Sequence, residues 1–335
     1  MREYLLPAGG QFYKANLHAH STVSDGAATP EEIRDAYRAA GYSVVAFTDH
    51  EVMVDHSELS GPDFLALRGY EIRVDDRTDR YETRKTYHIG LIARSPDITH
   101  QVFFNPRGHF TKNAAAYASS VLCREPVYQY TYSPMFINRL LRAARAEGFL
   151  PIYNHPHWSL HTEEDYLPLE GLFGIEVVNA TCSALRASAD TGSDIYERML
   201  RAGKTSLIPL ATDDNHNADG FSGPKSDSFI AFTMIKAPSL RYGDIIEALE
   251  SGDCYASAGP LIHALFRDGE TLTVETSPVR EILLLTDGRD GIRRTDVRPL
   301  TGASFRIPDG CAWFRLEMAD EAGRRAFTRA YLAAL

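Results

Sequence analysis

The segments "KANLHAH" (residues 14–20), "ATPEEIRDAYRAAG" (28–41) and "YSVVAFTDH" (42–50) follow one another and decide the fold. The first has the length and composition of a short strand. The second predicts a helix, because Thr29 is a suitable N-cap and Glu32 completes a capping box. The third is continuously apolar, which is typical of a strand buried on both faces of a parallel sheet. Together they predict a β-α-β unit.

The same alternation of helix and strand recurs along the chain. Residues 133–148 and 194–203 have helical patterns, and each precedes an apolar strand-like segment; residues 239–252 predict a further helix. This alternation of helices and strands indicates a parallel β/α barrel or a doubly wound sheet.

Residues 94–132 interrupt this alternation and are rich in Pro, Asn, Tyr and Ser. A long insertion of this kind is usually a lid or a substrate-binding loop.

The pattern changes again from about residue 260 onward. Short apolar segments alternate with Asp-Gly and Ala-Gly turns, which predicts antiparallel strands. In "WFRLEM" (313–318) apolar and polar residues alternate, so we expect an antiparallel strand with one face exposed. We therefore predict a barrel domain over residues 1–258, with the insertion at 94–132, and a small β-sandwich-like domain over 259–335.

Composition narrows the possible function. The chain has 335 residues, 44% of them hydrophobic and 24% charged, as in an average globular protein. Its formal net charge of −10 argues against binding to a nucleic-acid backbone. It has neither an apolar run long enough to span a membrane nor a signal-peptide core at the N-terminus, so we expect a cytoplasmic protein. Its four cysteines form no CxxC pair, which argues against a disulfide framework or a thiolate zinc site.

Histidines and carboxylates fall at the ends of successive predicted strands. Residues two apart on a strand share a face, so the side chains of His18 and His20 can reach one ion. In a β/α barrel the carboxyl ends of the strands meet at one mouth. The further candidate ligands at strand ends are His50, Glu71, His88, His155, Asp214 and His216. The occurrence of nitrogen and oxygen donors at the ends of successive strands predicts a metal site.

Six motifs occur in order along the chain: "HAHSTVSDG", "AFTDHE", "GYEI", "YHIGL", "NHPH" and "DDNH". As a set they resemble the motifs of PHP (polymerase and histidinol phosphatase) domain proteins over roughly residues 14–258. The resemblance implies a distorted seven-stranded β/α barrel, similar to a TIM barrel, and a metal-dependent phosphoesterase with a trinuclear metal centre.

The resemblance also implies which residues hold each ion. One site would take His18, His20, Glu71 and Asp214. A second would take Glu71, His88 and His155, with Glu71 bridging the two. A third would take Asp25, His50 and His216, with Asp25 standing where some relatives have histidine.

The chemistry of this ligand set is consistent with two or three divalent ions. Imidazole and carboxylate donors without thiolate suit zinc, manganese or iron. We expect a hydroxide bridging two ions to attack a small, anionic, phosphorylated substrate. The general acid is left open: His157 and Asp213 lie close to ligands in sequence, and Asp49 could orient an imidazole, but each could equally be a structural hydrogen-bonding residue.

The sequence also bears on other possible enzyme classes and on a non-catalytic role. The sequence lacks a GxSxG nucleophile elbow, a P-loop and a Rossmann GxGxxG motif. The segment "CYASAGPLIH" (254–263) followed by a β domain is similar to a branch of the family with carbamate-hydrolysing members. A metallohydrolase acting on a carboxyl ester, amide or carbamate is therefore the alternative. A non-catalytic PHP module is disfavoured, because all nine ligand positions carry a competent residue.

Overall fold

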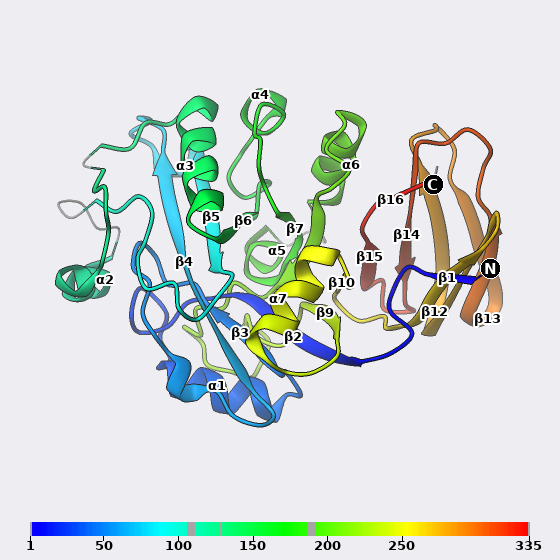
Figure 1. Ribbon diagram of the computed structural model, residues 1–335, viewed down its shortest axis with the longest axis horizontal. Coiled ribbons are helices and arrows are strands. Elements are labelled where there is room, and N and C mark those ends of the chain that lie inside the picture. Colours follow the sequence, from blue (N-terminus) through cyan, green and yellow to red (C-terminus); the bar gives the residue numbers. More distant parts are fainter. Residues whose placement is uncertain (1, 106–110, 128, 187–191, 334–335) are drawn as a thin grey trace.

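The computed structural model describes residues 2–105, 111–127, 129–186 and 192–333. Its strands form one continuous mixed sheet in which helices accompany one part and the other part is built of strands alone (Figure 1). The part with helices contains the sequence from β2 to β10, and the strands at the right of Figure 1 come from the C-terminal segment and from β1. The expected α/β class is confirmed.

Seven strands form the ring-like core of the first part, and most of them run in one direction. Neighbours pair in parallel from β2 to β4 and from β6 to β8, whereas β5 is antiparallel to both β4 and β6. Their bounds are β2 Gln11–Ala19, β3 Val44–Phe47, β4 Leu65–Asp75, β5 Thr86–Ala93, β6 Phe149–Tyr153, β7 Gly174–Asn179 and β8 Ile208–Thr212. Each residue of β3, β5, β6, β7 and β8 is buried, as expected for strands covered on both faces.

The predicted distorted seven-stranded barrel is not confirmed, because the described strands leave the sheet open. The free edge of β2 is taken by β9 (Phe232–Ala237), which pairs antiparallel with residues 11–15. The same edge cannot pair with β8 as well. Contact between β8 and β2 is made just beyond the end of β8: the Asp214 amide donates to the His18 carbonyl at 3.0 Å, and the His20 amide donates to the Asn215 carbonyl at 3.1 Å.

The four predicted helices are present. They are α1 Pro30–Ala39, α3 Pro134–Ala146, α6 Ser193–Arg201 and α7 Tyr242–Ser251. Helix α1 begins with the expected capping box between Thr29 and Glu32. These helices pack on β3, β6, β7 and β9 respectively, which covers the outer face of the sheet. Shorter helical elements are α2 Lys112–Tyr117, α4 Glu163–Tyr166, α5 Ala180–Arg186, η1 Ser57–Leu59, η2 Tyr81–Thr83 and η3 Ala118–Ser120.

The C-terminal segment consists of antiparallel strands around a core of its own. Their bounds are β10 Cys254–Ser257, β11 Ile262–Asp268, β12 Thr271–Thr286, β13 Ile292–Arg306, β14 Trp313–Ala319, β15 Arg325–Thr328 and β16 Tyr331–Leu332. Strand β10 joins the two parts, because it pairs with β9 on one side and β15 on the other. The N-terminal strand β1 (Arg2–Tyr4) pairs with β11, and Leu5 and Leu6 lie in this core. Residues 2–6 thus belong to the β-only part, and the predicted domain boundary at residue 258 stays a prediction.

The insertion at 94–132 packs partly against the sheet. The buried side chains of Val102 and Phe103 join the main core, and Gln101 donates to the Glu51 carbonyl at 2.9 Å. Residues 106–110 and 128 lie outside the described residues. The lid role of this segment stays a prediction.

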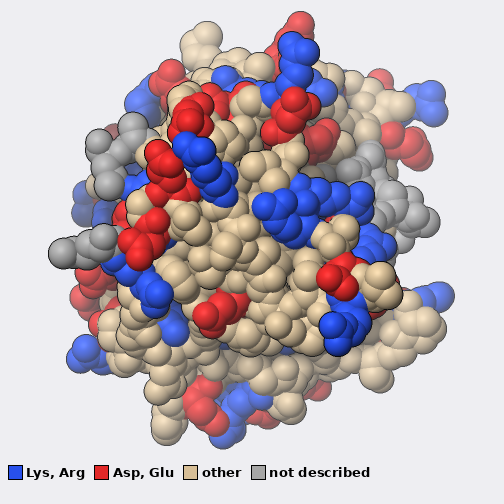
Figure 2. Space-filling model, turned by 90° about the vertical axis from the view of Figure 1, so that its right-hand side faces the viewer, with Lys and Arg blue, Asp and Glu red and all other residues tan. Residues whose placement is uncertain are grey.

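The surface bears charges of both signs. Figure 2 shows the face at the right of Figure 1, where Lys and Arg side chains are interspersed with Asp and Glu around a largely uncharged centre. This mixture agrees with the overall charge of −10. Among the described residues, no helix is long and apolar enough to cross a membrane.

Strand β14 is antiparallel as predicted, but the expected exposure of one face is wrong. All seven of its residues are buried, including Arg315 at 2% exposure, because helix α6 covers the polar face. The Arg315 guanidinium contacts the carboxylates of Glu317 at 2.5 Å and of Glu197, on α6, at 2.8 Å. This buried ion pair connects the β-only part to the part with helices.

Replacing Arg315 by Met should therefore destabilise the protein strongly. Arg315 is one of two cations at each carboxylate, since Glu317 keeps Arg325 and Glu197 keeps Arg201, and we expect the loss of its charged hydrogen bonds to lower the free energy of unfolding by about 1.5–3 kcal/mol. Urea unfolding followed by circular dichroism measures this. Arg38→Met is the matched control: Arg38 and Asp63 form an ion pair in which both side chains are more than half exposed, so its removal should cost less than about 1 kcal/mol. Equal losses in the two variants would contradict this account.

Candidate metal centre

The predicted ligands gather at one end of the strands β2 to β8. His18 lies on β2 and His20 directly follows it, Glu71 lies on β4, and His50, His155 and Asp214 lie two or three residues beyond β3, β6 and β8. His88 lies near the start of β5, which runs in the opposite direction, and it pairs with Arg73 near the end of β4. The reversed strand thus delivers its ligand to the same end of the sheet.

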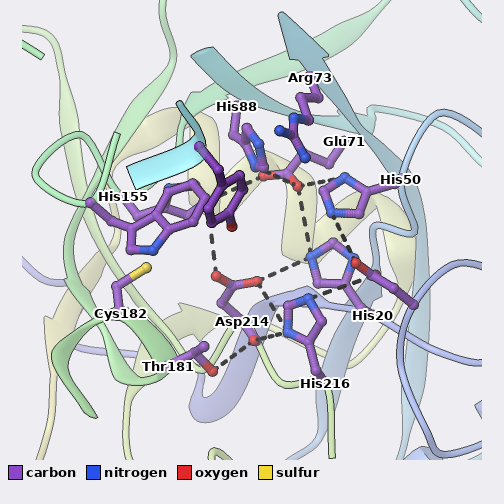
Figure 3. Close-up of a pocket in the computed structure, with 13 residues that line it drawn as sticks. His20, His50, Glu71, Arg73, His88, His155, Thr181, Cys182, Asp214 and His216 are labelled. Atoms are coloured by element: carbon purple, nitrogen blue, oxygen red, sulfur yellow. Dashed lines mark hydrogen bonds and ion pairs between the residues drawn. The ribbon is translucent and has the colours of Figure 1, made fainter. Parts of the chain in front are cut away.

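A cavity of about 240 Å³ opens above these residues. In Figure 3 the imidazoles of His20, His50, His88, His155 and His216 surround the carboxylates of Glu71 and Asp214. The cavity is lined by eight of the nine predicted ligands: His20, Asp25, His50, Glu71, His88, His155, Asp214 and His216. The ninth, His18, is buried at 1% exposure, and its ring nitrogen Nε2 lies 3.0 Å from Nε2 of His20.

The Glu71 carboxylate lies at the centre of the cluster. Its Oε2 atom is 3.0 Å from Nδ1 of His50 and 3.1 Å from Nδ1 of His88. Its Oε1 atom is 3.3 Å from Nε2 of His18 and accepts a hydrogen bond of 2.6 Å from the Asn154 amide. Burial alone would raise the pKa of Glu71, but the surrounding imidazoles hold that pKa well below its usual range. An ionised carboxylate that faces several strands suits a bridging ligand.

Asp214 is the second shared carboxylate. Its Oδ1 atom lies 3.0 Å from Nε2 of His20 and 3.2 Å from Nε2 of His18. The backbone of Asp214 adopts a left-handed conformation with φ of 52°. L residues seldom adopt this conformation, which is often found at functional sites. Here it turns the chain so that the Asp214 side chain faces the two histidines of β2.

The donor atoms fall into four overlapping groups, compared with the three predicted sites. Two groups follow the prediction closely: one joins His18, His20 and Asp214, and one joins Asp25, His50 and His216 with His20 added. A third joins Glu71 and His88 with His50 in place of His155. The fourth joins His18 and His155 with Glu176. The assignment of each ligand to an ion stays a prediction.

Several buried polar atoms in the cluster make no hydrogen bond, which fits a cation at this position. They are Nδ1 of His20, Oε2 of Glu71 and both ring nitrogens of His88; the 3.1 Å approach of Oε2 to Nδ1 of His88 does not have hydrogen-bond geometry. Buried polar atoms without partners are costly, so natural proteins rarely gather them unless a ligand satisfies them. Burial lowers the pKa of His88 to about 4, which leaves its imidazole neutral and able to offer a lone pair at pH 7.

The distances between the donor atoms also suit a bound metal ion. Zinc binds histidine nitrogens at about 2.1 Å in a tetrahedral arrangement, which places two such nitrogens roughly 3.4 Å apart. The facing nitrogens of His18 and His20 are 3.0 Å apart, with the Asp214 carboxylate at a similar distance from both. Small side-chain shifts would admit an ion between them.

Glu176 is a buried residue of the site that reading the sequence missed. It lies on β7, and its carboxylate contacts Nδ1 of His18 at 2.7 Å. It also accepts hydrogen bonds from the hydroxyl of Thr212 at 2.7 Å, the amide of His155 at 2.8 Å and the side chain of Asn179 at 2.9 Å. The available signal was a glutamate inside the otherwise apolar strand segment "GIEVV" (174–178). Glu176 thus orients the His18 ring and places Nε2 toward the cluster.

Asp49 holds the loop that carries Asp25. Its carboxylate accepts hydrogen bonds from the amides of Ser21 and Ser24 at 2.8 and 3.1 Å, and from their hydroxyls at 2.8 and 2.7 Å. A Cβ atom at Gly26 would lie 2.4 Å from the His20 carbonyl oxygen, so the loop closes tightly on the end of β2. Asp25 is thereby placed 3.6 Å from the ring nitrogens of His50 and His216.

The two candidate general acids occupy different surroundings. Asp213 is fully buried and does not line the cavity: it accepts hydrogen bonds from the hydroxyl of Tyr37 at 2.8 Å and from the amides of residues 229–231 at 2.7–3.0 Å. These bonds anchor the segment before β9. His157 lines a small adjoining cavity, and its Nε2 atom lies 2.7 Å from the Asp194 carboxylate.

Comparison with known proteins supports the family resemblance for part of the chain. Residues 16–130 match the PHP domain family, which confirms the resemblance there. No curated protein matches the sequence.

Two solved structures are similar to this one at low sequence identity. One is a two-domain protein containing a predicted PHP-like metal-dependent phosphoesterase from Bacteroides vulgatus ATCC 8482, at 18% identity and a TM-score of 0.47, covering 99% of this chain and 98% of that chain. Another is an amidohydrolase from Chromobacterium violaceum with bound sulfate and no metal, at 17% identity and a TM-score of 0.35, covering 60% of this chain and 87% of that chain.

Replacing Glu176 by Gln should weaken metal binding while the fold is kept. The amide keeps the volume of the side chain but loses the charge that orients His18, and the loss of such a supporting carboxylate typically costs 10- to 100-fold in metal affinity. Competition with a fluorescent zinc chelator measures it. Asp213→Asn is the control: it should lower the free energy of unfolding by about 1–3 kcal/mol and leave zinc affinity within a few-fold of wild type. The opposite pattern would mean that Asp213, and not Glu176, supports the ligands.

Proposed function

We propose that the chain is a metal-dependent hydrolase that cleaves small phosphorylated substrates. The observation that carries this proposal is the convergence of eight imidazole and carboxylate side chains around one cavity, with a ninth, His18, buried beside them; several buried polar atoms of this group make no hydrogen bond. The match of residues 16–130 to the PHP domain supports it. Under this proposal the ligands are His18, His20, Asp25, His50, Glu71, His88, His155, Asp214 and His216.

The charge of the site favours an anionic substrate once ions are bound. The cluster contains four carboxylates, those of Asp25, Glu71, Glu176 and Asp214. Two divalent ions would balance them, and three would leave a surplus of about two positive charges. A phosphate group would then be attracted to the cavity although the protein as a whole is acidic.

Divalent ions at these ligands would lower the pKa of a bound water and neutralise charge that develops on the substrate. The chain's own residues hold the geometry. Asn154 fixes one oxygen of the Glu71 carboxylate, and Glu176 fixes the ring of His18. His157, held by Asp194 beside the cavity, is the proposed proton donor to the leaving group, whereas Asp213 acts as an anchor.

Metal content tests the central claim. After expression with zinc, manganese and iron, we expect at least two ions per chain in the wild type, measured by inductively coupled plasma mass spectrometry. Glu71→Ala should lose most of them, because it removes the carboxylate shared between ligand groups. Glu58→Ala is the control, since Glu58 is an exposed residue of η1. A wild type without transition metal, or a Glu71→Ala variant with full metal content, would overturn the proposal.

A substrate panel tests the reaction. Phosphomonoesters, phosphodiesters and aryl carboxyl esters are offered to the metal-loaded protein, with release of phosphate or phenol as the readout. We expect the phosphomonoesters to be hydrolysed with the highest kcat/KM. Hydrolysis of carboxyl esters, amides or carbamates alone would support the alternative reaction, in which the same site attacks a carbonyl carbon. A metal-loaded protein that cleaves none of them would favour a non-catalytic module.

A further inference from the structure

Three side chains separate the metal-site cavity from a second cavity. Arg73, Tyr81 and Trp158 line the cavity of about 240 Å³ above the ligands, and the same three line a neighbouring cavity of about 210 Å³. The second cavity is completed by Glu82, Arg84, Thr86 and Leu160. Space therefore continues beyond the ligands, on the side of the loop between β4 and β5. None of these residues belongs to the predicted ligand set.

Trp158 is positioned by the ligands themselves. Its ring packs edge-to-face against His155, with centroids 5.1 Å apart at 86°, and against His88, at 5.6 Å and 63°. The turn that carries it is tight, because the Ser159 amide donates to the His155 carbonyl at 3.1 Å and Leu160 has a φ of 60°. A half-buried indole is thus held beside the place where a substrate would react.

Tyr81 also lines both cavities, but unlike the half-buried Trp158 it is 60% exposed. It begins the short helix η2 in the loop between β4 and β5. The loop is closed at its base by the Asp76 amide, which donates to the Lys85 carbonyl at 2.9 Å, and it is braced by Arg84, whose Nε donates to the Thr78 carbonyl at 2.9 Å. A large exposed aromatic ring at the rim of a cavity is typical of a binding surface.

Arg73 supplies a cation next to the ligands. It lies two residues after Glu71 on β4, so the two side chains share a face of the strand. Figure 3 shows its guanidinium beside His88 and Glu71. The residue is 8% exposed, and its Nε donates to the Asp75 carboxylate at 2.7 Å. A guanidinium is always charged and its planar donors match phosphate oxygens, so Arg73 can contact a phosphate held over the ligands.

We infer that Trp158 and Tyr81 form a leaving-group subsite for a flat aromatic ring, and that Arg73 contacts the phosphate, so that the substrates are aromatic phosphomonoesters. The inference rests on the proposed function. Aromatic walls on the far side of the phosphate position favour a ring over an aliphatic alcohol, because rings stack on aromatic side chains whatever their substituents. The second cavity provides room for the part of the leaving group that extends beyond the ring.

The kinetic test compares benzyl phosphate with glycerol 2-phosphate, because both release an aliphatic alcohol and only the first carries a ring. The metal-loaded wild type should prefer benzyl phosphate by about 10-fold in kcat/KM. Trp158→Ala and Tyr81→Ala should each reduce this preference, and Trp158→Phe should retain most of it because a ring remains. Arg73→Met should lower kcat/KM for both substrates alike, since both share the phosphate. Tyr117→Ala, an exposed tyrosine at the end of α2, is the control and should leave the preference unchanged.

A binding measurement separates the subsite from catalysis. The chain has two tryptophans, and Trp313 is buried at 2% exposure on β14, so Trp313→Phe leaves Trp158 as the single tryptophan, whose emission can be excited selectively. Titration of this metal-loaded variant with 4-nitrophenylphosphonate, which is not hydrolysed as a phosphate ester, should quench the fluorescence. Methylphosphonate should compete at least about 10-fold more weakly, because it has no ring to stack.

The outcomes distinguish the two proposals. Tight binding of 4-nitrophenylphosphonate without hydrolysis of any phosphate ester would support the subsite and overturn the phosphoesterase reaction. Hydrolysis of both phosphates with equal kcat/KM, or equal losses for both in Trp158→Ala and Tyr81→Ala, would overturn the subsite and leave the phosphoesterase reaction standing. Equal affinity for the nitrophenyl and methyl phosphonates would likewise overturn the subsite.

Discussion

The burial of the Glu71 carboxylate is the constraint on which the rest of this structure depends. Glu71 is fully buried, and an ionised carboxylate in that position is tolerated only when cationic or hydrogen-bonding groups surround it. Four elements supply such groups: His18 on β2, His50 after β3, His88 on β5 and Asn154 after β6. The strand ends must therefore converge around β4, and the curvature of the open sheet allows them to do so.

The open sheet follows from competition for one strand edge. Strand β9 occupies the edge of β2 along residues 11–15, so β8 meets β2 only at the carboxyl end. That limited contact has a chemical consequence. The residues just after β8 bond to the backbone of His18 and His20, and this brings the Asp214 carboxylate onto both imidazoles. Contact between the residues after β8 and β2 is thus made where the ligands lie, and the rest of that edge pairs with β9, which leads through β10 to the C-terminal strands.

The surroundings of the ligands differ on their two sides. Beneath them, Glu176, Asn179 and Thr212 form a buried network of hydrogen bonds that allows His18 little freedom. Above them, the cavity is bordered by Arg73, Tyr81 and Trp158, of which the tyrosine is largely exposed. A rigid base favours metal binding, because ligands held in place lose little freedom when an ion binds. A more open rim is where substrates can be distinguished, and this is why the two sides carry different roles in our proposals.

The sequence by itself determined the local elements and the candidate ligands. Helix α1 could be predicted from Thr29 and Glu32, because a capping box acts within a single turn of helix. The ligand types could be read because histidines and carboxylates at strand ends stand out against apolar strands. Only the tertiary structure decided the features that depend on contacts between distant segments. Three such features each join residues more than 100 positions apart: β9 pairs with the edge of β2, Arg315 is buried under α6, and Glu176 supports His18. Pairing energies of this kind depend on which segments meet in space, and spacing along the chain carries no record of that.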